Sequence, residues 1–354
     1  MNPNEIKSLI KTCYKARKSG SGAPVLFLQG SPGCGKTQVT YQTAEELTQE
    51  LDKPVPCYVF QATLYDPVEI KGLPIFTPEG TAKFLKFEDM PTADEGILFI
   101  DDLPHAPTQT QNAFMRVVLE GIAGAWNTGG LYSIIAGNKT SDRAGAKDLQ
   151  TAMANRLVFI EFNQRYEDWR QWAVGKGIAA EIVSYLATPY GGDWLNKFDP
   201  TKQNNATPRS WEFASQLINM FKGDQTIKRA LSGTILRESL HGCIGQEAAA
   251  KFIGWLNIYD KLPDLMDIIK GKNIYTDSVD SMYAIISGLV SIARSMEKKA
   301  KVFQRLIDYS LEVPKEHTEL GVWLGKDIYT LDPQAFRKLE LTAWRKRYEN
   351  FIAY

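Results

Sequence analysis

A glycine-rich loop between a strand-like run and a helix-like run constrains this chain more than any other feature of its sequence. The loop, Gly30 to Thr37, reads GSPGCGKT and matches the pattern GxxxxGK[ST]. The apolar run VLFLQ precedes it, and the segment TQVTYQTAEELTQEL, which has helical periodicity, follows it. In this context the pattern predicts a phosphate-binding loop and not a chance glycine-rich turn.

The residue types in the loop suit a triphosphate. Glycines let the backbone wrap the phosphates so that its N–H groups point at the oxygens, and the N-terminus of the helix adds positive potential. Lys36 is predicted to reach the β- and γ-phosphates, Thr37 to bind magnesium, and Pro32 to fix φ. The predicted nucleotide-binding residues are Gly30, Ser31, Pro32, Gly33, Cys34, Gly35, Lys36 and Thr37.

A second apolar run, GILFIDD, ends in two acidic residues, Asp101 and Asp102. Beside a phosphate loop, Asp101 is predicted to hold the metal and Asp102 to orient or deprotonate the attacking water. The alternative is an ordinary end of a strand, because paired aspartates favour turns.

Three more polar residues follow in an informative order. Asn138 comes directly after the strand-like YSIIAG and is predicted to position the lytic water. Arg156 precedes LVFIEF and is predicted to reach a neighbouring subunit's nucleotide as an arginine finger. Arg209 begins the helix-like RSWEFAS, where a positive charge opposes the helix dipole, which points to a partner such as a phosphate. Singly, each is more typical of a surface residue; together they are far more specific.

The hydrophobic pattern changes along the chain. Up to about Asn163, short apolar runs alternate with helical patterns, which indicates an α/β fold with a parallel sheet. Beyond that point only helical periodicity is found. We predict an α/β nucleotide-binding domain over residues 1–164, an α-helical lid over 165–264 and a helical C-terminal extension over 265–354. The predicted strands are VLFLQ, YVFQA, ILFI, YSIIAG and LVFIEF.

Composition narrows the function classes. The 354 residues carry 41 Lys and Arg against 41 Asp and Glu, and 44% are hydrophobic. These values exclude a disordered chain and a protein that coats nucleic acid through bulk positive charge, but not one with a local basic patch. No apolar run is long enough to span a membrane, and the four scattered cysteines lack zinc spacing. We therefore expect a reduced, cytoplasmic protein.

The order GSPGCGKT, ILFIDD, AGN, ANR and TPRSW resembles AAA+ ATPases of the MoxR-like, dynein-related branch, in a bacterial and phage subgroup. The resemblance spans nearly the whole chain and includes DPVEIKGLPIF, NKTSDRAG and FIGWLNIYDKLPDL. It implies an αβα sandwich with a five-stranded parallel sheet of order 5-1-4-3-2, a helical lid, ATP as substrate, and a ring, usually a hexamer. It also implies that Arg156 acts in trans, while the other site residues act in cis. Those residues are Lys36, Thr37, Asp101, Asp102, Asn138 and Arg209.

The resemblance also implies partners. MoxR-like ATPases commonly work with a protein that bears a von Willebrand factor A domain, and together they remodel or activate a protein client. An insert after the second strand lies at the pore in that family, which makes Phe76, Phe84 and Phe87 candidate contacts for the pore or the substrate. The alternative is that these aromatic residues anchor the insert to its own domain.

Two departures leave alternatives open. The family usually has Asp-Glu where this chain has Asp101-Asp102, and the shorter side chain is expected to slow water activation without weakening nucleotide binding. Arg143 is a second candidate for the trans arginine. The alternative functions are a motor stimulated by nucleic acid, against which the neutral net charge counts, and a nucleotide-gated scaffold with weak hydrolysis.

Overall fold

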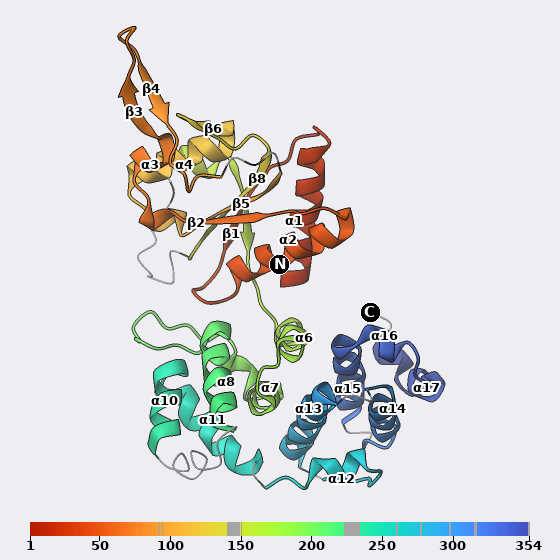
Figure 1. The fold of residues 1–354 in the computed structure, drawn as a ribbon. Coiled ribbons are helices and arrows are strands. Elements are labelled where there is room, and N and C mark those ends of the chain that lie inside the picture. The colour runs from red at the N-terminus through yellow and green to blue at the C-terminus, as the bar shows by residue number, and fades with distance from the viewer. Residues whose placement is uncertain are drawn as a thin grey trace. The chain divides into compact units, whose positions relative to one another are not determined.

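The chain folds into two units, Met1–Gln164 and Arg165–Tyr354, in the computed structural model (Figure 1). The structure describes residues 1–91, 93, 95–139, 149, 151–222, 234–259, 261–276, 278–296, 299–314 and 317–352. The predicted lid and the predicted extension both fall within the second unit. The three-part division stays a prediction.

A five-stranded parallel sheet forms the centre of the first unit. Every neighbouring pair of its strands is parallel. Numbered along the chain as five sheet strands, the order is 2-3-4-1-5, which is the expected order 5-1-4-3-2 read from the other edge. The predicted P-loop αβα fold is therefore confirmed. In spatial order the strands are β2 (Cys57–Gln61), β5 (Gly96–Asp101), β8 (Leu131–Gly137), β1 (Val25–Gln29) and β9 (Leu157–Glu161).

Helices cover both faces of this sheet, which explains why its central strands are apolar throughout. Leu26 and Leu28 of β1 belong to one core with α1 (Pro3–Lys18) and α2 (Lys36–Leu51). Phe27, between them, belongs to the opposite core with α4 (Thr108–Glu120). Successive strand residues point to opposite faces, so one short strand supplies both cores.

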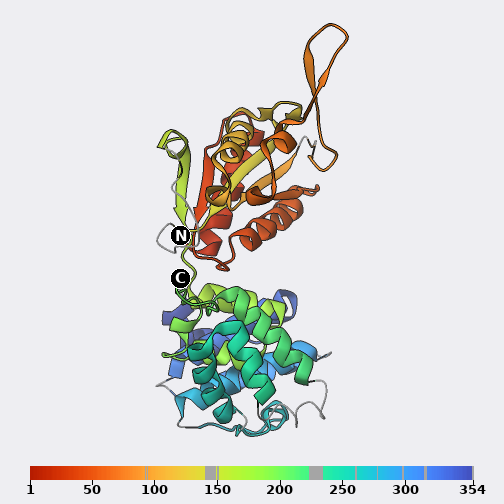
Figure 2. The ribbon, with the colours of Figure 1, turned by 90° about the vertical axis from the view of Figure 1, so that its left-hand side faces the viewer.

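A β-hairpin projects from the first unit (Figures 1 and 2). Its strands, β3 (Leu73–Phe76) and β4 (Ala82–Leu85), pair antiparallel, and all eight of their residues are exposed. The sequence pattern did not predict this hairpin. The short elements around it and the sheet are η1 (Ala62–Leu64), α3 (Pro67–Lys71), η2 (Leu103–His105), β6 (Ile122–Ala123), β7 (Trp126–Asn127) and α5 (Thr151–Ala154).

The described part of the second unit is helical, as predicted. A continuous apolar core runs through it from Trp169 to Tyr348. None of its described helices, nor any in the first unit, has the length and apolar character that crossing a membrane requires. The helices are α6 (Tyr166–Lys176), α7 (Ala180–Ala187), η4 (Gly192–Trp194), α8 (Pro208–Lys222), α10 (Thr234–Ile244), α11 (Gln246–Tyr259), α12 (Leu265–Ile269), α13 (Val279–Ser295), α14 (Lys299–Ser310), α15 (Thr318–Leu331), α16 (Pro333–Phe336) and α17 (Thr342–Ile352).

A buried ion pair joins α6 to α15 inside this core. Arg170 Nη2 lies 2.6 Å from Asp327 Oδ2, and Arg170 Nε also donates to both carboxylate oxygens, at 3.1 and 3.2 Å. The remaining guanidinium nitrogen, Nη1, donates to Tyr166 Oη at 2.9 Å. The pair therefore links the start of the predicted lid to the predicted extension.

Candidate nucleotide-binding and catalytic site

The predicted phosphate loop connects β1 to α2 at the carboxyl edge of the sheet. Gly33 has φ 74° and Gly35 has φ 105°, which is a left-handed region that glycine enters at little cost. At Gly30, a Cβ atom would lie 3.0 Å from both Cys34 Sγ and Phe162 Cβ. The glycines that suggested a wrapped loop are therefore required by its backbone geometry and by close packing.

The side chain of Cys34 points into the core, where its Sγ lies against Gly30. It is 1% exposed and packs with the residues that α1 and α2 bury against the sheet. Burial raises the pKa of the Cys34 thiol, although the charge of Lys36 acts in the opposite direction. The thiol therefore stays protonated and unreactive, and Cys34 contributes to the loop through its backbone.

Lys36, the first residue of α2, is 7% exposed, and its charge is balanced by oxygen acceptors. Its Nζ donates to the carbonyl oxygens of Gly30 at 2.8 Å and Ser31 at 3.2 Å, and to Asn138 Oδ1 at 3.1 Å. The structure thus brings together two predicted site residues that lie 102 positions apart in the chain.

Thr37 and Asp101 meet beside this lysine. Thr37 Oγ1 donates to Asp101 Oδ2 at 2.7 Å, across 64 residues of sequence. A hydroxyl and a carboxylate at one point are the oxygen ligands that Mg²⁺ prefers, so these two residues fit the predicted metal site.

Asp102, directly after β5, adopts a left-handed backbone conformation with φ 54° and ψ 30°. Its N–H donates to Asp101 Oδ1 at 3.0 Å. Among residues with a Cβ atom, aspartate and asparagine enter this region most readily. The backbone at this position therefore favours the aspartate that sets this chain apart from the Asp-Glu of the family it resembles.

His105, at the end of η2, was not among the predicted site residues. Its Nδ1 lies 3.6 Å from Asp102 Oδ1, and its Nε2 lies 3.5 Å from Asn138 Nδ2. The signal that was available is the spacing in DDLPHA, where a single tight turn after Asp102 returns the ring to the end of the strand.

Of the arginines predicted to contact phosphate, Arg156 lies away from the phosphate loop of its own sheet. Arg156 is exposed and precedes β9, at the amino end of a parallel strand. The five residues of β9 span roughly 16 Å at 3.3 Å per residue, so Arg156 lies far from the carboxyl edge where the loop is. Arg209 is exposed at the start of α8 in the second unit, and its cis role stays a prediction. Arg143 lies outside the described residues.

The three aromatic residues of the predicted insert are exposed. Phe76 is 90% exposed, Phe84 45% and Phe87 36%. The first two belong to the β3–β4 hairpin. The hairpin is therefore apolar although its aromatic side chains are not buried in the first unit.

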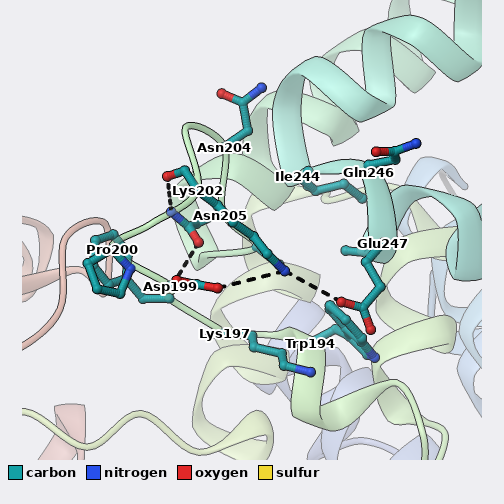
Figure 3. A pocket seen from close by; sticks show the side chains of 14 residues that line it. Trp194, Lys197, Asp199, Pro200, Lys202, Asn204, Asn205, Ile244, Gln246 and Glu247 are labelled. Atoms are coloured by element: carbon teal, nitrogen blue, oxygen red, sulfur yellow. Dashed lines mark hydrogen bonds and ion pairs between the residues drawn. The ribbon is translucent and has the colours of Figure 1, made fainter.

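A separate pocket of about 350 Å³ lies in the second unit, between the loop that follows η4 and the junction of α10 with α11 (Figure 3). The side chain of Lys202 extends across the pocket, and its Nζ lies 3.8 Å from Asp199 Oδ2 and 3.5 Å from Glu247 Oε2. None of the predicted site residues lines this pocket.

The sheet order, the phosphate loop and the paired residues at the carboxyl edge define the αβα fold of P-loop NTPases, with the strand order expected of the AAA+ class. No protein-family model matches the chain, and no curated protein does. The chain is similar to a solved RuvB mutant from Thermotoga maritima, with 13% identity and a TM-score of 0.40 over 81% of this chain and 82% of that one. A second RuvB mutant has 12% identity and a TM-score of 0.41 over 87% and 88%. NtrX from Brucella abortus, solved with ATP, has 14% identity and a TM-score of 0.38 over 97% and 67%.

Proposed function

We propose that this chain is a magnesium-dependent ATPase whose hydrolysis remodels or activates a protein client. The observation that carries the proposal is the meeting of four predicted residues at the carboxyl edge of the sheet. Lys36 contacts Asn138, and Thr37 contacts Asp101, so these four residues come together from three separate segments of the chain. A chance glycine-rich turn gives no reason for these pairings.

Each residue has one task in the proposed reaction. The loop N–H groups and Lys36 bind the phosphates, and Thr37 with Asp101 holds the metal. Asp102 orients the attacking water and takes its proton, while Asn138 orients the same water from the next strand. The magnesium ion, when bound, neutralises charge that develops on the phosphate oxygens.

The position of Arg156 supports a ring. A side chain at the amino end of β9 is about 16 Å from its own sheet's carboxyl edge, but it is exposed and free to enter a neighbouring copy's site. A head-to-tail interface of this kind closes into a ring when its rotation permits. We therefore propose a homo-oligomeric ring, a hexamer by resemblance to the MoxR-like branch, with Arg156 acting in trans.

The client-binding part of the proposal rests on the hairpin and on the resemblance. An exposed hairpin that carries Phe76 and Phe84 suits contact with an unfolded or extended protein segment. A partner with a von Willebrand factor A domain is proposed from the resemblance alone. All four cysteines are free thiols, which supports the cytoplasm as the location.

A mixing experiment tests both the activity and the trans arginine. Lys36→Ala and Arg156→Ala should each abolish ATP hydrolysis, and Arg156→Ala should keep most nucleotide binding, because arginine fingers contribute about 10³- to 10⁵-fold to turnover. Equal amounts of the two inactive variants should recover activity, since about a quarter of the sites in a random head-to-tail ring then combine an intact Lys36 with an intact Arg156.

Three results would change the proposal. If the wild-type chain hydrolyses ATP but the mixture of the two variants recovers no activity, Arg156 does not act in trans. Nucleotide binding without turnover, with and without partner proteins, would favour a nucleotide-gated scaffold. Turnover that rises strongly with DNA and falls with salt would favour a nucleic-acid motor.

A further inference from the structure

The ring of His105 lies between the two residues that the proposed reaction uses to position water. It is largely buried, with 14% of its side chain exposed. One ring nitrogen faces Asp102 Oδ1 at 3.6 Å, and the other faces Asn138 Nδ2 at 3.5 Å. The buried Nδ1 has no hydrogen-bond partner within normal bonding distance. The carboxylate that it faces is that of Asp102.

Lys36 determines the direction of the hydrogen bonds in this group. An ammonium group has donors only, so the amide oxygen of Asn138 must face Lys36 Nζ, at 3.1 Å. The Asn138 NH₂ group then faces the ring, and His105 Nε2 must accept its hydrogen bond. A neutral imidazole that accepts at Nε2 carries its proton on Nδ1, and that N–H points at the Asp102 carboxylate.

Close packing holds the ring in this place. At Gly137, the last residue of β8, a Cβ atom would lie 2.7 Å from Pro104 Cγ and Cδ. The missing side chain lets η2 close directly onto the end of β8. That approach brings His105, next to Pro104, within reach of Asn138, next to Gly137.

We propose that His105 is a positioning residue for ATP hydrolysis, which holds Asp102 and Asn138 in the arrangement that orients the attacking water. The inference rests on the proposed ATPase function. Among the described residues, the polar contacts of the His105 ring are with Asp102 and Asn138 and not with the phosphate loop or the metal-binding pair, so its removal should affect turnover and not nucleotide binding.

Kinetics of three variants test the inference. His105→Ala should lower kcat about 10- to 100-fold, as loss of a group that orients catalytic residues does, with the nucleotide Kd within about threefold of wild type. His105→Gln supplies one acceptor and one donor on one side chain, so it should recover part of kcat. His241→Ala is the matched control, because His241 also faces a carboxylate, Glu238 Oε1 at 3.9 Å, but lies in the second unit. It should leave kcat unchanged.

A double mutant separates positioning from a structural role. If His105 acts through Asn138, then His105→Ala should cost much less turnover in an Asn138→Ala background than in wild type. The inference is overturned if kcat of His105→Ala is normal. It is also overturned if the loss of turnover caused by His105→Ala is fully additive with that caused by Asn138→Ala. Either result leaves the ATPase proposal intact. A parallel loss of nucleotide binding and turnover also overturns it, since it indicates a structural role. Absence of turnover in the wild-type chain under all conditions overturns the proposed function, and the inference with it.

Discussion

Replacing Asp327 with alanine should strongly destabilise the second unit, because it leaves the buried Arg170 charge without its partner. The carboxylate accepts hydrogen bonds from two guanidinium nitrogens, Nε and Nη2, at 2.6 to 3.2 Å. Each charge-assisted donor contributes about 1.5–3 kcal/mol, so losing both suggests about 3–6 kcal/mol. Breaking a buried pair by removing one partner typically costs about 3–5 kcal/mol, which agrees with this range. Burial raises the pKa of Asp327, and Arg170 opposes that effect.

Tryptophan fluorescence during urea unfolding measures this effect well. Seven of the eight tryptophans lie in the second unit, and the eighth, Trp126, lies in the first. The fluorescence transition therefore reports mainly on the unit that contains the ion pair. The midpoint should fall in Asp327→Ala with little change in slope, because the surface exposed on unfolding stays nearly the same.

Two further variants check the reasoning. Asp267→Ala removes one partner of an exposed pair, Lys272 with Asp267, and should change stability far less than Asp327→Ala does. The double variant Arg170→Met with Asp327→Leu removes both buried charges and should be more stable than Asp327→Ala, because no unpaired charge is left. Either of two results would refute the argument from the unpaired charge. One is a free energy of unfolding for Asp327→Ala within about 0.5 kcal/mol of the wild-type value, and the other is a double variant as unstable as Asp327→Ala.

Three other predictions concern the first unit. Gly137→Ala should lower its thermal stability by about 1–3 kcal/mol, because the new methyl group meets Pro104 at 2.7 Å; an unchanged melting temperature would show that η2 can move aside freely. Phe76→Ser should change the free energy of unfolding by less than about 0.5 kcal/mol, because the ring is 90% exposed; a larger loss, measured by urea unfolding, would show that the ring is packed. Hydrogen bonds from Lys11 and Lys15 lower the pKa of Glu50 from 4.5 to about 2. This contribution to stability is present above pH 4.5 and is lost as the pH falls towards 2. Protection of the α1 amides from hydrogen exchange should therefore be weaker at pH 3 than at pH 5.5. Equal protection at the two pH values, after correction for intrinsic exchange rates, would contradict this prediction.

Local signals made much of the first unit predictable. The GxxxxGK[ST] spacing located a loop whose glycines have the positive φ values that the pattern requires. Apolar runs identified the five sheet strands, because buried parallel strands are apolar on both faces. Their spatial order came from the resemblance and not from the runs, since neighbouring strands in a parallel sheet need not be neighbours in sequence.

The hairpin and the helical packing were not predictable in the same way. β3 and β4 are short, and β3 contains a proline. Every residue of both strands is exposed, so they lack the buried alternation by which a strand is identified. In the second unit, helical periodicity indicated the helices, but not that α6 would pair with α15 across 157 residues. That pairing depends on shape and charge in the folded core.

The sequence by itself determined the chemistry that this protein has available, namely a phosphate loop, two acids after a strand and an asparagine after the next strand. Each of these is a local pattern, because the backbone geometry that it needs depends on a few neighbouring residues. Only the tertiary structure decided which groups meet. It placed Lys36 beside Asn138 and Thr37 beside Asp101, and it brought His105 between Asp102 and Asn138. Such contacts join segments that are far apart in the chain, and their directions follow from hydrogen-bond geometry that exists only once the sheet has formed.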